Sequence, residues 1–175
     1  GAARVVGLVP AIEKARLYRG KGGEVMRASA CTVIESVARG GLPGVINKDV
    51  ARMMESVDDN LKHPTTDIQR AAVSALRGLA EERFELMSDK WQHTKVLDKY
   101  CKAVRSDPNP AARRGFALAL GALGKGLLGR HLQEALDALS QAATTVQEAA
   151  DERDPESRRN AVLGLVGVVE TVGLG

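Results

Sequence analysis

One short pattern, an arginine followed by small and aliphatic residues, occurs four times along the chain at nearly constant spacing. The copies are Arg27–Val33, Arg70–Leu76, Arg114–Leu120 and Arg159–Leu165. The successive arginines lie 43, 44 and 45 residues apart. A repeat of this length predicts a series of similar structural units that pack against one another and share a core.

The apolar residues around each copy recur at helical intervals. In the second copy they are Ile68, Ala72, Val73, Leu76 and Leu79, and in the third they are Ala112, Phe116, Ala117, Leu120 and Leu123. This spacing of i, i+4, i+5, i+8 and i+11 predicts an amphipathic helix, because a half-buried strand would alternate every second residue. The equivalence of the copies also predicts that Val73, Ala117 and Val162 share one packed environment.

A second amphipathic stretch precedes each copy. These stretches lie at about residues 5–18, 48–62, 93–105 and 130–143, although Pro10 weakens the first half of the earliest one. We therefore expect an all-α protein, an α-solenoid of about four HEAT-like helical hairpins. The expected repeats cover roughly residues 4–39, 47–83, 92–126 and 130–173 of a single domain that spans residues 1–175.

Turn residues separate the two helices of each expected hairpin. Asp107 is expected to cap the helix of the third copy, and Pro108 or Pro110 to begin it. Residues 63–67 and 154–157, which also combine proline with a carboxylate, occupy the same place before the second and fourth copies. The chain therefore carries its helix-start signals at the spacing of the repeat.

Composition limits the classes of protein that remain. The chain is 44% hydrophobic but only 3% aromatic, with a net charge of +3, so its core is expected to be aliphatic. Cys31 and Cys101 are expected to be small buried hydrophobes. No apolar run reaches the about 18 residues of a membrane span, and a cytoplasmic protein is expected. The apolar end at residues 171–175 lacks a polar capping repeat, so we expect a piece of a longer chain.

Two glycine-rich stretches partly match nucleotide-binding loops. Residues 20–24 have Val25 where a dinucleotide fingerprint requires glycine, and residues 124–126 lack the remaining positions of a phosphate loop. Neither follows a predicted strand, as such loops normally do. Glycines at helix ends explain both stretches, and no cofactor is expected.

Histidines and carboxylates give no catalytic or metal pattern. His63, His93 and His131 are 30 and 38 residues apart, and no Cys-x-x-Cys is present. Metal sites usually draw ligands from closely spaced pairs. The carboxylates lie on predicted polar faces, with no pair singled out for acid–base chemistry. We expect neither a metal site nor an enzyme.

Paired cations recur at one position of the repeat, at Arg113-Arg114 and at Arg158-Arg159. One interpretation is an exposed cationic stripe for an acidic partner. The other, favoured for one arginine of each pair, is a structural ladder to helix-start carboxylates and neighbouring carbonyls. Trp91 is either a binding anchor or a cover over helix ends. The candidate protein-interaction residues are Arg19, Lys21, Arg77, Arg113, Arg158 and Trp91.

Two segments resemble a known family. Leu17-Tyr-Arg-Gly-Lys-Gly-Gly-Glu-Val-Met-Arg27 is similar to the Leu-Tyr-Arg-Gly-x-Gly-Gly-Glu-Leu-Met-Arg segment of the tubulin-folding cofactor D family. Residues 115–123 are similar to that family's Gly-Phe-Ser-Leu-Ala-Leu-Gly-Ala-Leu stretch. Shorter similarities at residues 156–159 and 171–173 extend the resemblance over most of the chain.

The resemblance implies a C-terminal portion of a large cytoplasmic HEAT-repeat chaperone. It implies binding to β-tubulin and a complex with a small Arf-like GTPase and with tubulin-folding cofactors E and C. Such a complex assists the assembly and disassembly of the α/β-tubulin heterodimer, stimulates GTP hydrolysis and associates with microtubules. The residues themselves leave an alternative open, namely a HEAT scaffold that binds nucleic acid or another acidic partner.

Overall fold

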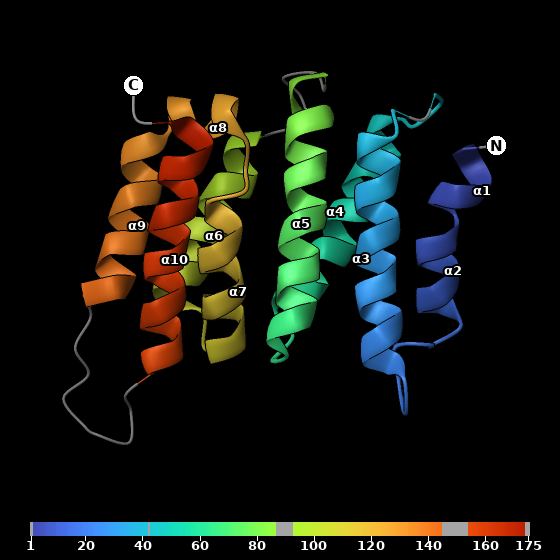
Figure 1. The fold of residues 1–175 in the computed structure, drawn as a ribbon, viewed down its shortest axis with the longest axis horizontal. Helices are drawn as coiled ribbons and strands as arrows, with labels where there is room; N and C mark the ends of the chain where they lie inside the picture. The colour runs from blue at the N-terminus through green and yellow to red at the C-terminus, as the bar shows by residue number, and fades with distance from the viewer. Residues whose placement is uncertain (1, 42, 87–92, 145–153, 174–175) are drawn as a thin grey trace. The chain divides into compact units, whose positions relative to one another are not determined.

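A computed structural model describes residues 2–41, 43–86, 93–144 and 154–173 of the chain (Figure 1). All regular structure within these ranges is helical, and they contain no strand. The prediction of an all-α protein is therefore confirmed.

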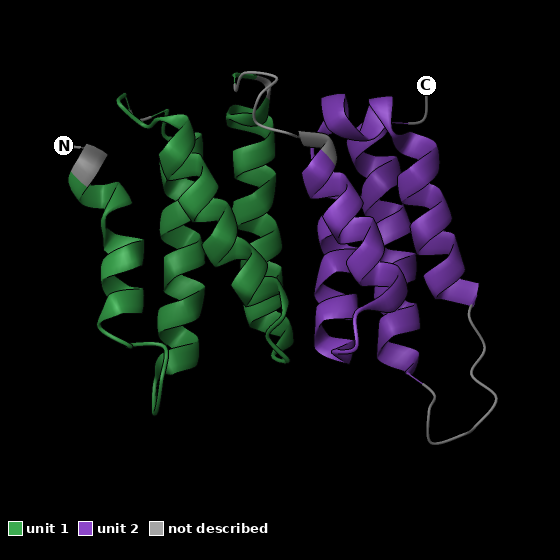
Figure 2. Ribbon diagram, turned by 180° about the vertical axis from the view of Figure 1, so that it is seen from behind, with its two compact units in different colours: residues 1–91 green, residues 92–175 purple. Residues whose placement is uncertain are grey.

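The chain divides into two compact units, Gly1–Trp91 and Gln92–Gly175, coloured separately in Figure 2. Each unit corresponds to two of the predicted repeats. A single solenoid running through both units stays a prediction.

Unit 1 consists of two helical hairpins. Its elements are α1 (Ala2–Val6), α2 (Leu8–Lys14), α3 (Gly23–Arg39), α4 (Asn47–Leu61), α5 (Thr66–Glu82) and the short 3-10 helix η1 (Phe84–Leu86). Helix α2 contacts α3, and α4 contacts α5. The most extensive contact joins α3 to α5, the two helices that carry the first and second copies of the arginine pattern.

The core of unit 1 comes from the predicted apolar stripes. The fully buried side chains include Ala30, Ile34, Leu61, Ile68, Ala72, Leu76 and Leu79. Their helical spacing places them on one side of each helix. Burial of these aliphatic side chains between α3, α4 and α5 stabilises the unit by about 25 cal/mol for each Å² of apolar area.

Unit 2 repeats the arrangement with an additional short helix. Its elements are α6 (His93–Ser106), α7 (Pro110–Leu120), α8 (Lys125–Arg130), α9 (Leu132–Thr144) and α10 (Pro155–Val172). Helix α6 packs on α7 and α9, and α10 packs on the same two helices. The rings of Tyr100 and Phe116 join α6 to α7, with centroids 4.8 Å apart.

Glycines allow α7 and α10 to approach closely. A Cβ atom added to Gly121, directly after α7, would lie 2.8 Å from the Cα atom of Gly167 in α10. Near the same contact, the Thr171 hydroxyl donates to the Gly121 carbonyl at 2.6 Å. Small residues at a helix crossing thus set the distance between the third and fourth copies of the pattern.

Several predicted boundaries were wrong. The expected first helix at residues 5–18 is instead two helices that break near Gly7, and α2 ends at Lys14. Pro10 lies in the first turn of α2, where its missing N–H costs little. The cap of α7 is Asn109, whose side chain accepts from the Ala111 N–H at 3.0 Å, rather than Asp107.

Helix α8 and one core position also differ from expectation. Gly124, which is expected at a helix end, has a φ of 86° and directly precedes α8, a helix that the sequence pattern does not predict. Among the three positions expected to be equivalent, Ala117 is buried, Val73 is half-buried and Val162 is 51% exposed. The described helices of unit 2 that contact α10 are α7, α8 and α9, and they leave Val162 exposed.

Candidate protein-interaction surface

Arg27, near the start of α3, makes side-chain contacts with the end of α4. Its guanidinium donates to the Asp59 carboxylate at 2.8 Å and to the buried Asn60 side-chain oxygen at 2.9 Å. The Arg27 Cζ atom also lies 4.6 Å from the centroid of the Tyr18 ring, a cation–π distance. Arg27, the first arginine of the repeated pattern, is therefore structural.

The connection between α2 and α3 is a tight turn with unusual backbone angles. Gly20 and Gly22 have φ values of 79° and 90°, and Arg16 adopts the left-handed region with φ 55°. Gly23 allows no side chain, because a Cβ atom there would lie 2.3 Å from the Tyr18 carbonyl oxygen. The glycines expected to end helices thus shape this turn and the start of α3.

Four cations project from this connection, which we call the basic turn (residues 14–21). Lys14, Arg16, Arg19 and Lys21 are all exposed. None has a side-chain hydrogen bond or ion pair with the part of the chain that the structure describes. The sequence analysis selected Arg19 and Lys21 but missed Lys14 and Arg16. The four cations follow one another without an acidic residue between them, and this pattern could have indicated all four.

A ladder of the expected kind joins α7 to the start of α10. Arg113 donates to the Asp107 carbonyl oxygen at 2.7 Å and to the Asp154 carboxylate at 3.2 Å. Arg114 lies 3.6 Å from the same carboxylate. Both arginines of this pair thus take part in the structural ladder that was expected of one of them, and a role of Arg113 in binding a partner stays a prediction.

Asp154 is both a helix cap and the acceptor of this ladder. Its carboxylate accepts from the Ser157 N–H at 3.0 Å and from the Ser157 hydroxyl. Burial by itself raises the pKa of the Asp154 carboxyl, but the Ser157 hydrogen bonds, Arg113 and Arg114 outweigh burial and hold that pKa below its ordinary value. The carboxylate is thus kept charged at the contact between the third and fourth copies.

The other candidate residues lie in different surroundings. Arg158 is exposed on α10 and its Nε donates to the Ala143 carbonyl oxygen at 3.4 Å. Arg159 is exposed, whereas Arg77 is half-buried on α5 and has an interaction partner. Trp91 lies outside the described residues. Of the described candidates, Arg19, Lys21 and Arg77 belong to unit 1, and Arg113 and Arg158 belong to unit 2.

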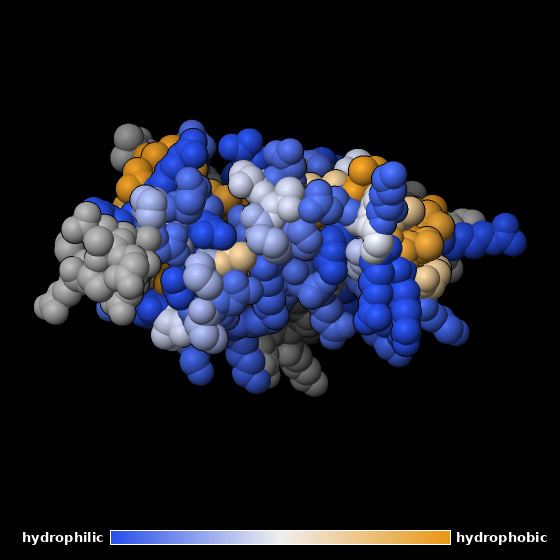
Figure 3. Space-filling view, turned by 90° about the horizontal axis from the view of Figure 1, so that it is seen from below, coloured by the Kyte–Doolittle hydropathy of each residue, from blue (hydrophilic) through white to orange (hydrophobic). Residues whose placement is uncertain are grey.

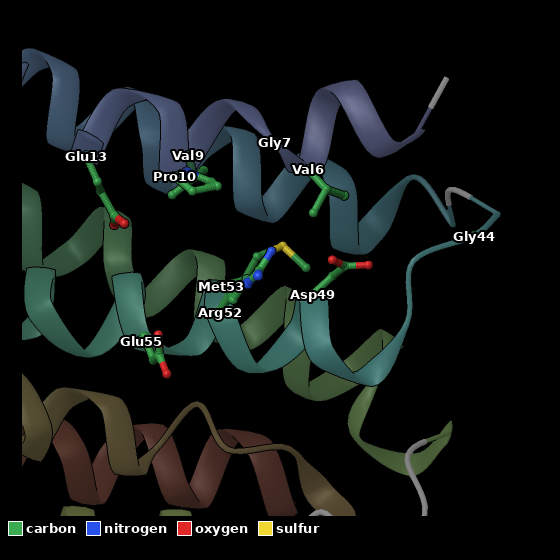
Figure 4. Close-up of a pocket in the computed structure, with 10 residues that line it drawn as sticks. All are labelled: Val6, Gly7, Val9, Pro10, Glu13, Gly44, Asp49, Arg52, Met53 and Glu55. Atoms are coloured by element: carbon green, nitrogen blue, oxygen red, sulfur yellow. The ribbon is translucent and has the colours of Figure 1, made fainter. Parts of the chain in front are cut away.

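Unit 1 contains a cavity that sequence reasoning missed. It has a volume of about 440 Å³ and lies between α1–α2 and α4 (Figure 4). Its lining includes the apolar side chains of Val6, Val9, Pro10 and Met53, together with Glu13, Asp49, Arg52 and Glu55. Three carboxylates against one guanidinium suit an apolar group that carries positive charge.

A further apolar surface lies on α10. Val162, Leu163, Val166 and Val169 are between 40% and 51% exposed and follow one face of the helix. Figure 3 shows hydrophobic patches, in orange, interrupting a mostly hydrophilic surface in the view from below. Exposed apolar patches of this kind commonly mark contacts between proteins.

Metal sites and reactive thiols have structural requirements with which the described residues can be compared. They contain no group of three or more His, Cys, Asp or Glu side chains arranged to hold a metal ion. Cys31 and Cys101 are buried, and burial raises the thiol pKa to about 12 and about 11, respectively. In the same residues, no helix is both long and apolar enough to cross a membrane.

Comparison with known proteins gives a similarity that covers part of the chain. No family model and no solved structure matches the chain. Tubulin-specific chaperone D of Dictyostelium discoideum is 32% identical over 75 residues, which cover 38% of this chain and 4% of that protein. The chain thus spans a small part of the relative's length. The similarity agrees with the resemblance seen in the residues, over part of the chain.

Proposed function

We propose that this chain is a non-catalytic protein-interaction module of a tubulin-folding chaperone. The observation that carries the proposal is the 32% identity over 75 residues to tubulin-specific chaperone D. The paired helical hairpins support it, because stacked hairpins offer broad surfaces that suit protein partners.

The proposed module takes part in the assembly and disassembly of the α/β-tubulin heterodimer in the cytoplasm, including at microtubules. Its partners are β-tubulin, a small Arf-like GTPase and tubulin-folding cofactors E and C. The exposed sites available for them are the basic turn, the cavity beside α4 and the apolar face of α10. Contact at such surfaces depends on complementary shape and charge rather than on any reacting group.

A binding experiment with purified components tests the proposal. The chain is immobilised and incubated separately with α/β-tubulin, the GTPase and the two cofactors at low and at moderate salt. Retention of tubulin or of the GTPase, and not of an unrelated acidic protein of similar charge, is the expected result. If none of these partners is retained at either salt concentration, the proposal is wrong.

The alternative of a nucleic-acid scaffold has less support from the contacts. Its candidate phosphate contacts are the paired arginines Arg113, Arg114, Arg158 and Arg159, and the first two of these share the Asp154 carboxylate. An arginine held by a carboxylate is less available to neutralise a phosphate. Filter binding with duplex DNA at low salt separates the two functions, because steeply salt-dependent retention of DNA would favour the scaffold.

A further inference from the structure

We propose that the basic turn, with the exposed Leu17 and Val25 beside it, binds an acidic polypeptide segment that also carries apolar side chains. The inference names the partner chemistry of one surface of the proposed interaction module, and to that extent it rests on the proposed function. The site lies entirely in unit 1, between the end of α2 and the first turn of α3.

The charge of the basic turn is not compensated locally. Residues 14–23 contain four cations and no carboxylate. The flanking carboxylates are Glu13 and Glu24, and these two negative charges cannot balance four positive ones. The Glu24 carboxylate also accepts a hydrogen bond from the Thr65 hydroxyl at 3.0 Å, which directs it toward α5. A single exposed ion pair contributes little to binding. A segment with several carboxylates would make several such contacts at once.

The turn is held in place by its backbone, which leaves its cationic side chains free. The Leu17 N–H donates to the Ile12 carbonyl at 3.2 Å, and the Arg19 N–H donates to the Arg16 carbonyl at 3.1 Å. Tyr18, between these residues, is fixed by the Arg27 guanidinium. An ordered loop loses less conformational entropy when it binds than a floppy one. The left-handed backbone of Arg16 is a conformational cost of the kind that often occurs at binding sites.

Two apolar side chains favour a polypeptide over a nucleic acid. Leu17 is 47% exposed within the turn, and Val25 is 71% exposed in the first turn of α3. Polynucleotide sites instead combine cations with exposed aromatic rings on which bases stack. The aromatic residue of this turn, Tyr18, is half-buried and already contacts Arg27. The mixed surface therefore fits glutamate or aspartate side chains interspersed with aliphatic ones.

The test measures fluorescence anisotropy of a labelled peptide rich in glutamate and containing leucine, added to the whole chain. A peptide with glutamine in place of each glutamate measures the contribution of charge. The test variant is Arg19→Ala with Lys21→Ala. The matched control is Lys102→Ala with Lys125→Ala, which removes the same charge from exposed positions of unit 2. Circular dichroism verifies that each variant keeps its helical content.

We expect the wild-type chain to bind the glutamate peptide and not the glutamine peptide, and to bind less tightly as ionic strength rises from about 0.01 M to about 0.15 M. The test variant is expected to bind about tenfold more weakly, whereas the control variant keeps its affinity. Arg19→Lys with Lys21→Arg is expected to restore most of the binding, because it restores the charge.

The inference is overturned if the wild-type chain does not bind the glutamate peptide, or if the test variant and the control variant weaken binding equally. It is also overturned if duplex DNA binds more tightly than the peptide and does so through Arg19 and Lys21. Parallel retention of tubulin keeps this inference separate from the proposed function. Peptide binding without tubulin, GTPase or cofactor binding would remove the chaperone role and leave the acidic-segment site. If the peptide does not bind, and if tubulin binds equally to the wild-type chain and to the Arg19→Ala, Lys21→Ala variant, the acidic-segment site is wrong and the chaperone role remains.

Discussion

Gly164 in α10 lies so close to α7 that a Cβ atom added to it would sit 2.3 Å from the Ala117 carbonyl oxygen and 2.8 Å from the Leu139 Cδ2 atom. A backbone oxygen within a helix cannot move aside as a flexible side chain can. The close packing of the third and fourth copies of the pattern therefore depends on the absence of a side chain at this position.

Gly164→Ala is accordingly expected to destabilise the protein, although alanine is the better helix former. Overpacking of this kind costs about 1–3 kcal/mol, and urea denaturation followed by circular dichroism measures it. Gly129→Ala in α8 is the matched control, because a Cβ atom there meets no other atom within 4 Å. The control is expected to be neutral or stabilising by about 0.5–1 kcal/mol. Equal losses in both variants would contradict the packing argument.

Truncation of the aliphatic core is expected to be costly in either unit. Leu76 in α5 and Leu120 in α7 are fully buried, so Leu76→Ala or Leu120→Ala should lower the free energy of unfolding by about 2–5 kcal/mol. Leu163→Ala provides a comparison, because Leu163 is 42% exposed. That substitution is expected to change stability by only about 0.5 kcal/mol. A loss of stability from Leu163→Ala as large as that from Leu76→Ala or Leu120→Ala, measured by thermal or urea denaturation, would contradict this account of the core.

Arg27→Ala is expected to destabilise unit 1 through a polar group that it leaves behind. Its pair with Asp59 is largely exposed on the carboxylate side and contributes little. The larger loss comes from the buried Asn60 side-chain oxygen, whose donor is Arg27. An unsatisfied buried acceptor lowers the free energy of unfolding by about 1–3 kcal/mol. Urea denaturation followed by circular dichroism measures this loss. Arg19→Ala removes the same charge without removing a contact and is expected to leave stability unchanged, so a similar loss from both variants would refute this account.

The hairpins could be predicted from the sequence because each depends on a local periodic pattern. The apolar stripe of α5 and the Asp154-Pro155 start of α10 can each be recognised from a short stretch of sequence. Helix α8 was missed because its two buried residues, Leu127 and Leu128, are too few to form a period. The exposure of Val162 was missed for another reason, since equivalence along the chain does not specify which neighbours cover a position.

The candidate surfaces were less predictable than the fold. The ladder from Arg113 was anticipated, because helix-start carboxylates and recurring arginines are signals within the repeat. The cavity was not, because it brings Val9 together with Met53, and nothing in either local sequence indicates the other. The basic turn lies between these cases. Its charges are visible in the sequence, but their lack of partners in the described residues required the structure.

Both cysteines are expected to be unreactive in the native protein. Burial of Cys31 and Cys101 raises the thiol pKa to about 12 and about 11, so very little of the nucleophilic thiolate is present at neutral pH. We expect a thiol-specific chromogenic reagent to modify both residues slowly in buffer and rapidly once denaturant is added. Rapid modification of either thiol in the folded chain would show that the surrounding helices open frequently.

The Asp154 ladder predicts a specific dependence of stability on acid. Hydrogen bonds from Ser157 and the charges of Arg113 and Arg114 hold the pKa of this carboxyl below its ordinary value of 3.8, against the opposing effect of burial. A carboxyl with a lowered pKa in the folded state stabilises that state above the unfolded pKa, and this contribution is lost as pH falls through the folded value. Asp154→Asn keeps a capping side chain but removes the charge.

We therefore expect Asp154→Asn to be less stable than the wild-type chain by about 1 kcal/mol near neutral pH, where the carboxylate is fully charged. The gap should narrow as pH is lowered below 3.8, because protonation then removes the same interactions from the wild-type protein. Urea denaturation of both proteins across this range measures the gap directly. Asp107→Asn is the matched control, because Arg113 uses the Asp107 carbonyl and not its carboxylate. A gap for Asp154→Asn that stays constant into acid, or that Asp107→Asn reproduces, would mean that the charge of Asp154 does not stabilise the contact between α7 and α10.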